Sequence, residues 1–222
     1  MDLLATAVVA AVALLLAAAV LAWWLRRRAA FQSALTRRGW QVTRNGDSTT
    51  VVPVTEDWTV TMSRSFAAQM TPPSSHVVTS TWTSPTPCMP NAALVAGPAP
   101  DRQSAELAAE LLGALTPSMA GWLGIDSITG GRPLHSVASA DDRLLVFATD
   151  GYGPVGALSE VADAVGAWCA DHTAEREQPV VSINGAGVCV RVRTDVLRSV
   201  EHLNAFVELG MRCRDSLSRS RG

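Results

Sequence analysis

The apolar run near the amino terminus constrains this chain more than any other feature. Leu3 to Trp24 form an uncharged stretch of 22 residues. With a rise of about 1.5 Å per residue, a helix over this run is roughly 33 Å long, enough to cross a hydrocarbon core of about 30 Å. A helix is expected because lipid offers no partners for unpaired backbone groups. The run therefore predicts a transmembrane anchor over residues 1–25.

The charges that flank the run predict its orientation. Only Met1 and Asp2 precede it, whereas six arginines and no acidic residue lie within residues 26–44. Because basic residues near a membrane helix favour the cytoplasmic side, we expect a single-pass protein of the cell membrane with its amino terminus outside and its carboxy-terminal domain in the cytoplasm. The alternative is a cleaved signal peptide, since residues 17–22 contain small residues at a spacing that suits cleavage. A signal peptide, however, carries its positive charge before the apolar segment.

The residues that follow the anchor predict a basic juxtamembrane helix over 26–39, since no Gly or Pro occurs before Gly39. Its arginines either contact anionic headgroups of the lipid bilayer or only stop translocation. Both interpretations give the same topology.

The composition of the chain excludes several chemistries. All 18 basic residues are Arg, so a Walker-type lysine, a Schiff-base lysine and a lysine general base are absent. Residues 45–222 hold 12 Arg and 19 acidic residues, a net charge of about −7. Nucleic acid is therefore not expected as a partner. The four scattered cysteines are expected to be reduced thiols in a cytoplasmic domain.

Residues 40–217 predict a soluble α+β domain with two possible halves, 40–120 and 130–217, followed by a short tail over 218–222. Alternating patterns and turn residues predict a largely antiparallel sheet with helices packed on one face. Strands are expected over 40–43, 49–54, 58–63, 76–84, 92–96, 132–138, 143–149, 179–183 and 188–192. Helices are expected over 101–115, over 157–172 and after Thr194, which is placed to cap the last one.

One glycine-rich segment is a candidate ligand site. Gly151, Gly153 and Gly156 form a G-x-G-x-x-G pattern between an apolar strand and a helix. The segment resembles the phosphate-binding turn of Rossmann-type domains, which implies that these glycines approach a nucleotide or another anion. It departs from that pattern because Asp150 adjoins the first glycine and because the next strand, which ends at Asn184, enters a hairpin without an acidic residue. The alternative is a structural turn between strand and helix.

Other candidate sites are weaker. Cys169 and His172 have a spacing that suits two metal ligands on a helix, but a structural zinc site needs four and Cys169 also fits an apolar stripe. The five tryptophans beyond the anchor suit a core or an aromatic groove for a peptide. The sequence contains no G-x-S-x-G, H-E-x-x-H or Walker motif.

The sequence thus predicts a membrane-anchored protein that presents a cytoplasmic interaction or assembly domain, with a protein partner or a homo-oligomer, no cofactor and no catalysis. The alternative is a ligand-responsive domain that binds a nucleotide or another anion at the turn from Gly151 to Gly156. A membrane-tethered hydrolase would need a cluster of polar residues that the sequence does not reveal.

Overall fold

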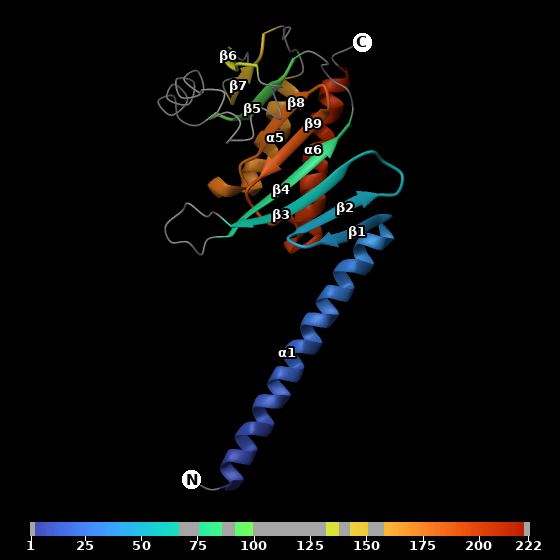
Figure 1. Ribbon diagram of the computed structural model, residues 1–222, viewed down its shortest axis with the longest axis vertical. Coiled ribbons are helices and arrows are strands. Elements are labelled where there is room, and N and C mark those ends of the chain that lie inside the picture. Colours follow the sequence, from blue (N-terminus) through green and yellow to red (C-terminus); the bar gives the residue numbers. More distant parts are fainter. Residues whose placement is uncertain are drawn as a thin grey trace.

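A long helix and a nine-stranded sheet dominate the molecule (Figure 1). The computed structural model describes residues 3–66, 76–85, 92–99, 132–137, 143–150 and 158–219. The helices are α1 (Leu3–Arg37), α5 (Leu158–Asp171) and α6 (Val200–Arg219), with 3-10 turns η1 (Glu175–Glu177) and η2 (Val196–Arg198). The strands are β1 (Trp40–Asn45), β2 (Ser48–Pro53), β3 (Thr59–Phe66), β4 (His76–Ser84), β5 (Leu94–Pro98), β6 (His135–Val137), β7 (Leu144–Ala148), β8 (Val180–Asn184) and β9 (Gly187–Val192).

All strands pair antiparallel, in the order β1-β2-β3-β4-β9-β8-β5-β7-β6. Strands β1 to β4 pair in chain order as a meander. Gly46 adopts φ +56° in the tight turn between β1 and β2, a conformation that glycine reaches without steric cost. The β8–β9 hairpin then inserts between β4 and β5, so that Ser80 pairs with Val192. Strands distant in the sequence thereby become neighbours.

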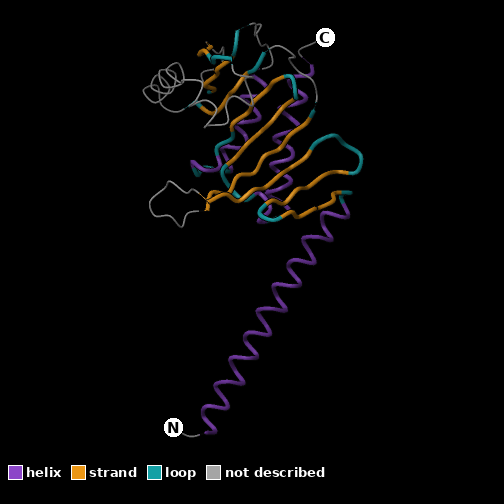
Figure 2. Tube along the Cα trace, viewed as in Figure 1, coloured by secondary structure: helices purple, strands orange, loops and turns teal. Residues whose placement is uncertain are grey.

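Helices α5 and α6 cover one face of this sheet (Figure 2). The core lies between them and the sheet, where Trp82, Leu203 and Phe206 are fully buried. Burial of each such side chain contributes on the order of 1.5–3 kcal/mol, which explains why the apolar stripe of α6 faces β4 and β9. The opposite face of the central strands carries no helix among the described residues.

Helix α1 joins the domain only at its carboxy-terminal end and otherwise projects away from it (Figure 1). Leu35 is buried, and Phe31 packs against the core. The helix ends where Gly39 takes φ +71° and its N–H donates to the Thr36 carbonyl at 2.9 Å, a common helix termination. Within the part of the chain that the structure describes, no helix is both long and apolar enough to span a membrane.

The α+β class and the antiparallel sheet agree with the sequence-based prediction. One detail differs. The last helix begins at Val200, where Ser199 Oγ accepts from the His202 N–H, and Thr194 does not cap it. Strand β5 lies beside β8, because the β8–β9 hairpin separates it from β4. The helix expected over 101–115 lies outside the described residues.

Candidate functional site

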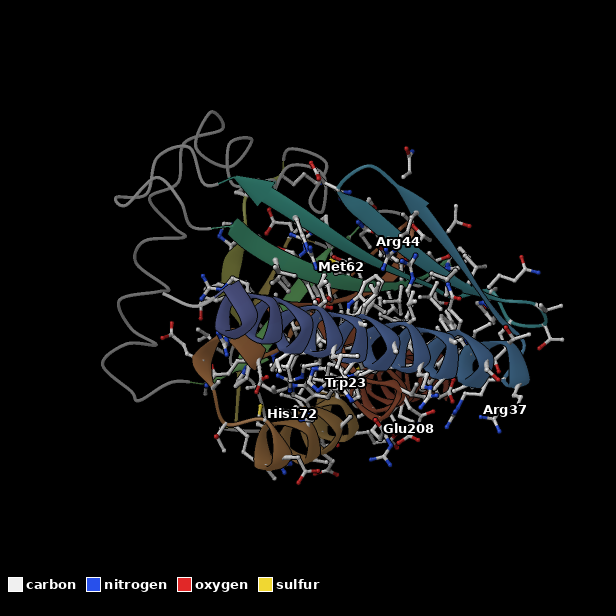
Figure 3. All side chains as sticks on the ribbon, turned by 90° about the horizontal axis from the view of Figure 1, so that it is seen from below. Trp23, Arg37, Arg44, Met62, His172 and Glu208 are labelled. Carbon is white, nitrogen blue, oxygen red and sulfur yellow. The ribbon has the colours of Figure 1, made fainter. Side chains whose placement is uncertain are left out.

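An arginine-lined pocket of about 250 Å³ lies between α1, the first three strands and η2. Figure 3 views the molecule from the side on which α1 projects. It shows Arg44 and Met62 on one side of that helix and His172 and Glu208 on the other. The lining residues are Trp24, Arg27, Arg28, Phe31, Gln32, Val42, Arg44, Thr49, Met62, Arg64, Asp195, Leu197 and Arg198.

The strand register places the β-sheet part of the pocket. Arg44 pairs with Thr49 across β1 and β2, and Thr49 pairs with Met62 on β3. Residues directly opposite in neighbouring strands share a face, so these three side chains form one row across the sheet. The row continues to Ser80, whose partner is Met62. The pocket therefore forms where the Arg44 end of this row, on the edge strand β1, meets α1.

Ser80 also fixes the remaining wall. Its hydroxyl donates to the Thr194 carbonyl at 2.6 Å and accepts from the Val196 N–H at 3.3 Å. These buried bonds hold η2 against β4, and Asp195 accepts from the Leu197 N–H to start the 3-10 turn. Arg198 at the end of this turn is thereby directed to the pocket.

Positive charge exceeds negative charge around the pocket. Asp195 is its only acidic lining residue, and it forms an ion pair with Arg64 at 3.5 Å. Among the described residues, Arg27, Arg28 and Arg44 form no ion pair. The guanidinium carbon of Arg27 lies 5.5 Å from the ring centroid of Trp23, and that of Arg28 lies 5.4 Å from the ring centroid of Trp24. Such cation–π contacts leave the positive charge of both arginines unneutralised. The arrangement suits an anionic ligand.

Arg198 connects the pocket to a buried aromatic cluster. One guanidinium nitrogen, Nη2, donates to His202 Nδ1 at 3.1 Å and contacts Glu177 Oε1 at 3.1 Å. Burial above all, and then the neighbouring Arg198 and His172, lower the pKa of His202 to about 4. His202 is thus neutral at pH 7, and its Nδ1 acts as the acceptor for Arg198.

His172 belongs to the same cluster. Its ring stacks on Trp168 with centroids 3.7 Å apart and planes at 8°. Its Nδ1 bonds to the Trp168 carbonyl oxygen at 2.9 Å. Nowhere in the described ranges do three His, Cys, Asp or Glu side chains gather as metal ligands. The partner that the sequence suggested, Cys169, is partly buried beside the core, and burial raises its pKa.

Gly151, Gly153 and Gly156 lie outside the described residues, so the predicted anion site at that turn stays a prediction. Sequence reasoning missed Arg44, Arg64 and Arg198 as members of a pocket. The spacing of Val42 and Arg44 was a visible signal, because residues two apart in a strand share one face. The wall formed by η2 was not, because it depends on the contact between Ser80 and Thr194.

Comparison with known proteins adds no functional information. No family model matches the chain, and neither a curated protein nor a solved structure is similar to it.

Proposed function

We propose that this chain is a single-pass membrane protein, anchored by the run from Leu3 to Trp24, whose α+β domain serves in the cytoplasm as an interaction or assembly module. The amino terminus lies outside. No catalytic role is assigned to any described residue.

The observation that carries the anchor is the apolar exposure of α1. Leu14, Leu15 and Leu16 are consecutive and are 72%, 71% and 62% exposed. Consecutive residues of a helix point in directions about 100° apart, so this part of α1 is apolar around its circumference. A protein groove would cover one side of such a helix, whereas lipid covers all sides. The apolar part ends at Trp23 and Trp24, the side chains that favour the headgroup layer.

Two observations support the anchor: the run from Leu3 to Trp24 is uncharged, and the apolar side chains of α1 are exposed.

Extraction from membranes tests the anchor. The full chain is expected to stay in the membrane pellet after alkaline carbonate treatment. Leu15→Arg combined with Ala18→Arg is expected to move it to the supernatant, since each Arg costs about 2.5–3.5 kcal/mol at the centre of a spanning helix. The matched control places Arg at the exposed domain positions Val54 and Val180 and is expected to remain in the pellet. Release of the unchanged chain by carbonate would contradict the anchor.

The sheet face that no described helix covers, the helix-free face, supports the interaction module. It presents exposed polar side chains, including Ser63, Thr83 and Arg191, and a cavity of about 490 Å³ beside the β8–β9 hairpin. A broad polar face beside a small cavity resembles the mixed surfaces of non-obligate protein interfaces.

Photocrosslinking tests this part of the proposal. A photoreactive amino acid at Thr83 is expected to capture a protein partner or a second copy in intact cells. The matched control is Ala170, which is exposed on α5, on the side away from that face. Equal capture from both positions, or from neither, would contradict an interface on the helix-free face.

A further inference from the structure

We infer that the arginine-lined pocket binds the headgroup of an anionic phospholipid, and that this contact holds the domain against the membrane surface. The inference rests on the proposed anchor, since the pocket must lie at the bilayer. The recognised chemistry is a lipid phosphate with net negative charge.

The position of the pocket along α1 favours this ligand. Arg27 and Arg28 follow Trp24 by three and four residues, which is about 5–6 Å along a helix. The polar layer on each side of a bilayer is roughly 5–7 Å thick. If Trp24 lies at the edge of the hydrocarbon core, both guanidinium groups lie at the depth of lipid phosphates.

The positive charges around the pocket suit a lipid phosphate. Arg27 and Arg28 extend from the helix and Arg44 extends from β1, so cations approach the pocket from two elements. None of the three is neutralised by an acidic side chain of the described chain. Guanidinium groups bind phosphate oxygens through two parallel hydrogen bonds, which makes arginine the favoured residue for such ligands.

The apolar lining distinguishes a lipid from a soluble phosphate. Phe31, Met62 and Leu197 form part of the pocket and offer no hydrogen bond to a free ion. They suit the glycerol and the first methylene groups of a lipid. The volume of about 250 Å³ fits a headgroup better than a whole nucleotide, since sites for complete small molecules occupy about 300–1,000 Å³.

Lipid titration of the full chain in detergent tests the inference. Native mass spectrometry would count bound dioctanoyl phosphatidylglycerol, with dioctanoyl phosphatidylcholine and inorganic phosphate as the other two ligands. The anionic lipid is expected to bind at least tenfold more tightly than the other two. Binding of phosphatidylcholine with equal affinity would overturn the role of charge. Inorganic phosphate that displaces the lipid at equal concentration would show a soluble-anion site instead.

Paired variants locate the binding. Arg44→Gln combined with Arg64→Gln is expected to weaken the binding of phosphatidylglycerol roughly tenfold or more. Arg176→Gln with Arg193→Gln removes the same charge from exposed positions outside the pocket and is expected to leave lipid affinity unchanged. An equal loss of lipid affinity in both pairs would show that only net charge matters, and it would overturn the pocket as the binding site.

A second pair of variants changes α1 alone and leaves the sheet residues unchanged. Arg27→Gln with Arg28→Gln changes only exposed side chains of α1 and is expected to weaken lipid binding without altering thermal unfolding. Unchanged affinity in this pair would also overturn the inference. All of these variants keep Leu3 to Trp24, so carbonate extraction reports separately on the anchor. A chain that stays in membranes but shows no lipid preference would refute the pocket alone.

Discussion

Gly210 lies directly against the indole ring of Trp82. A Cβ atom built at position 210 would lie 2.2 Å from Cδ2 of that ring, far inside van der Waals contact. Trp82 is fully buried in the middle of β4, so its ring has no space into which to move. The absence of a side chain at 210 is therefore what allows α6 to approach the sheet this closely.

Gly210→Ala is expected to destabilise the domain, although alanine favours helix by about 1 kcal/mol. Overpacking costs typically 1–3 kcal/mol and more where nothing relaxes, so we expect a net loss of about 1–2 kcal/mol in the free energy of unfolding by urea. The control is Gly166→Ala on α5, where the nearest atom, Arg143 Nη1, is 4.0 Å away. That variant is expected to be as stable as the parent or slightly more so. Equal stability of both variants would contradict the close packing.

Gly187 combines a positive φ with a close backbone contact. Its φ is +130°, and a Cβ there would lie 2.0 Å from the Ser84 carbonyl oxygen, a backbone atom that cannot rotate away. Gly187→Ala is expected to lower the free energy of unfolding by about 2 kcal/mol or more. At Gly46, where φ is +56°, an added Cβ meets no atom within 4 Å. We therefore expect Gly46→Ala to lower the free energy of unfolding by only about 1 kcal/mol. Thermal unfolding compares the two, and a similar loss for both would remove the steric argument.

His202 makes the stability of the domain depend on pH. Its pKa is about 4 in the folded protein and near the ordinary 6.5 when unfolded, so between these values the unfolded chain binds more protons. The stability is fully present above about pH 6.5 and falls as the pH falls towards 4. The charged groups around it are Arg198 and His172, which oppose protonation, and Glu177 and Asp195, which favour it.

His202→Gln removes this titration and keeps a side-chain acceptor for Arg198. Between pH 7 and pH 5 we expect the free energy of unfolding to fall by up to about 2 kcal/mol more for the parent than for this variant. Urea unfolding at both pH values measures the difference. Parallel curves for parent and variant would show that His202 does not titrate in this range.

Local signals in the sequence predicted the hairpins, while distant contacts decided the rest. Asn45-Gly46 fixes a turn within a few residues, and the glycines from 185 to 187 do the same for β8 and β9. No local pattern indicates that β9 pairs with β4, because that choice depends on the packing of α6 over Trp82. The order of the sheet was therefore beyond sequence reasoning.

The candidate pocket shows the same limit. The arginines after Trp24 were evident as a charged cluster, and their partners on the sheet were not. Arg44 joins them through the register of β1 and β2, and Arg198 joins through a hydrogen bond from Ser80 to Thr194. The charge was predictable, but the cavity that concentrates it was not.

Thiol labelling in intact cells tests the proposed topology most directly. Cys88, Cys169 and Cys189 would be replaced by serine. Cys213 would be kept, since it is fully buried and burial raises its pKa to about 12. A single reporter, Ala174→Cys, lies at an exposed position before η1, and the parent without it is the control. A membrane-impermeant maleimide is expected to label this cysteine only after permeabilisation. Labelling in intact cells would place the domain outside the membrane and contradict the account.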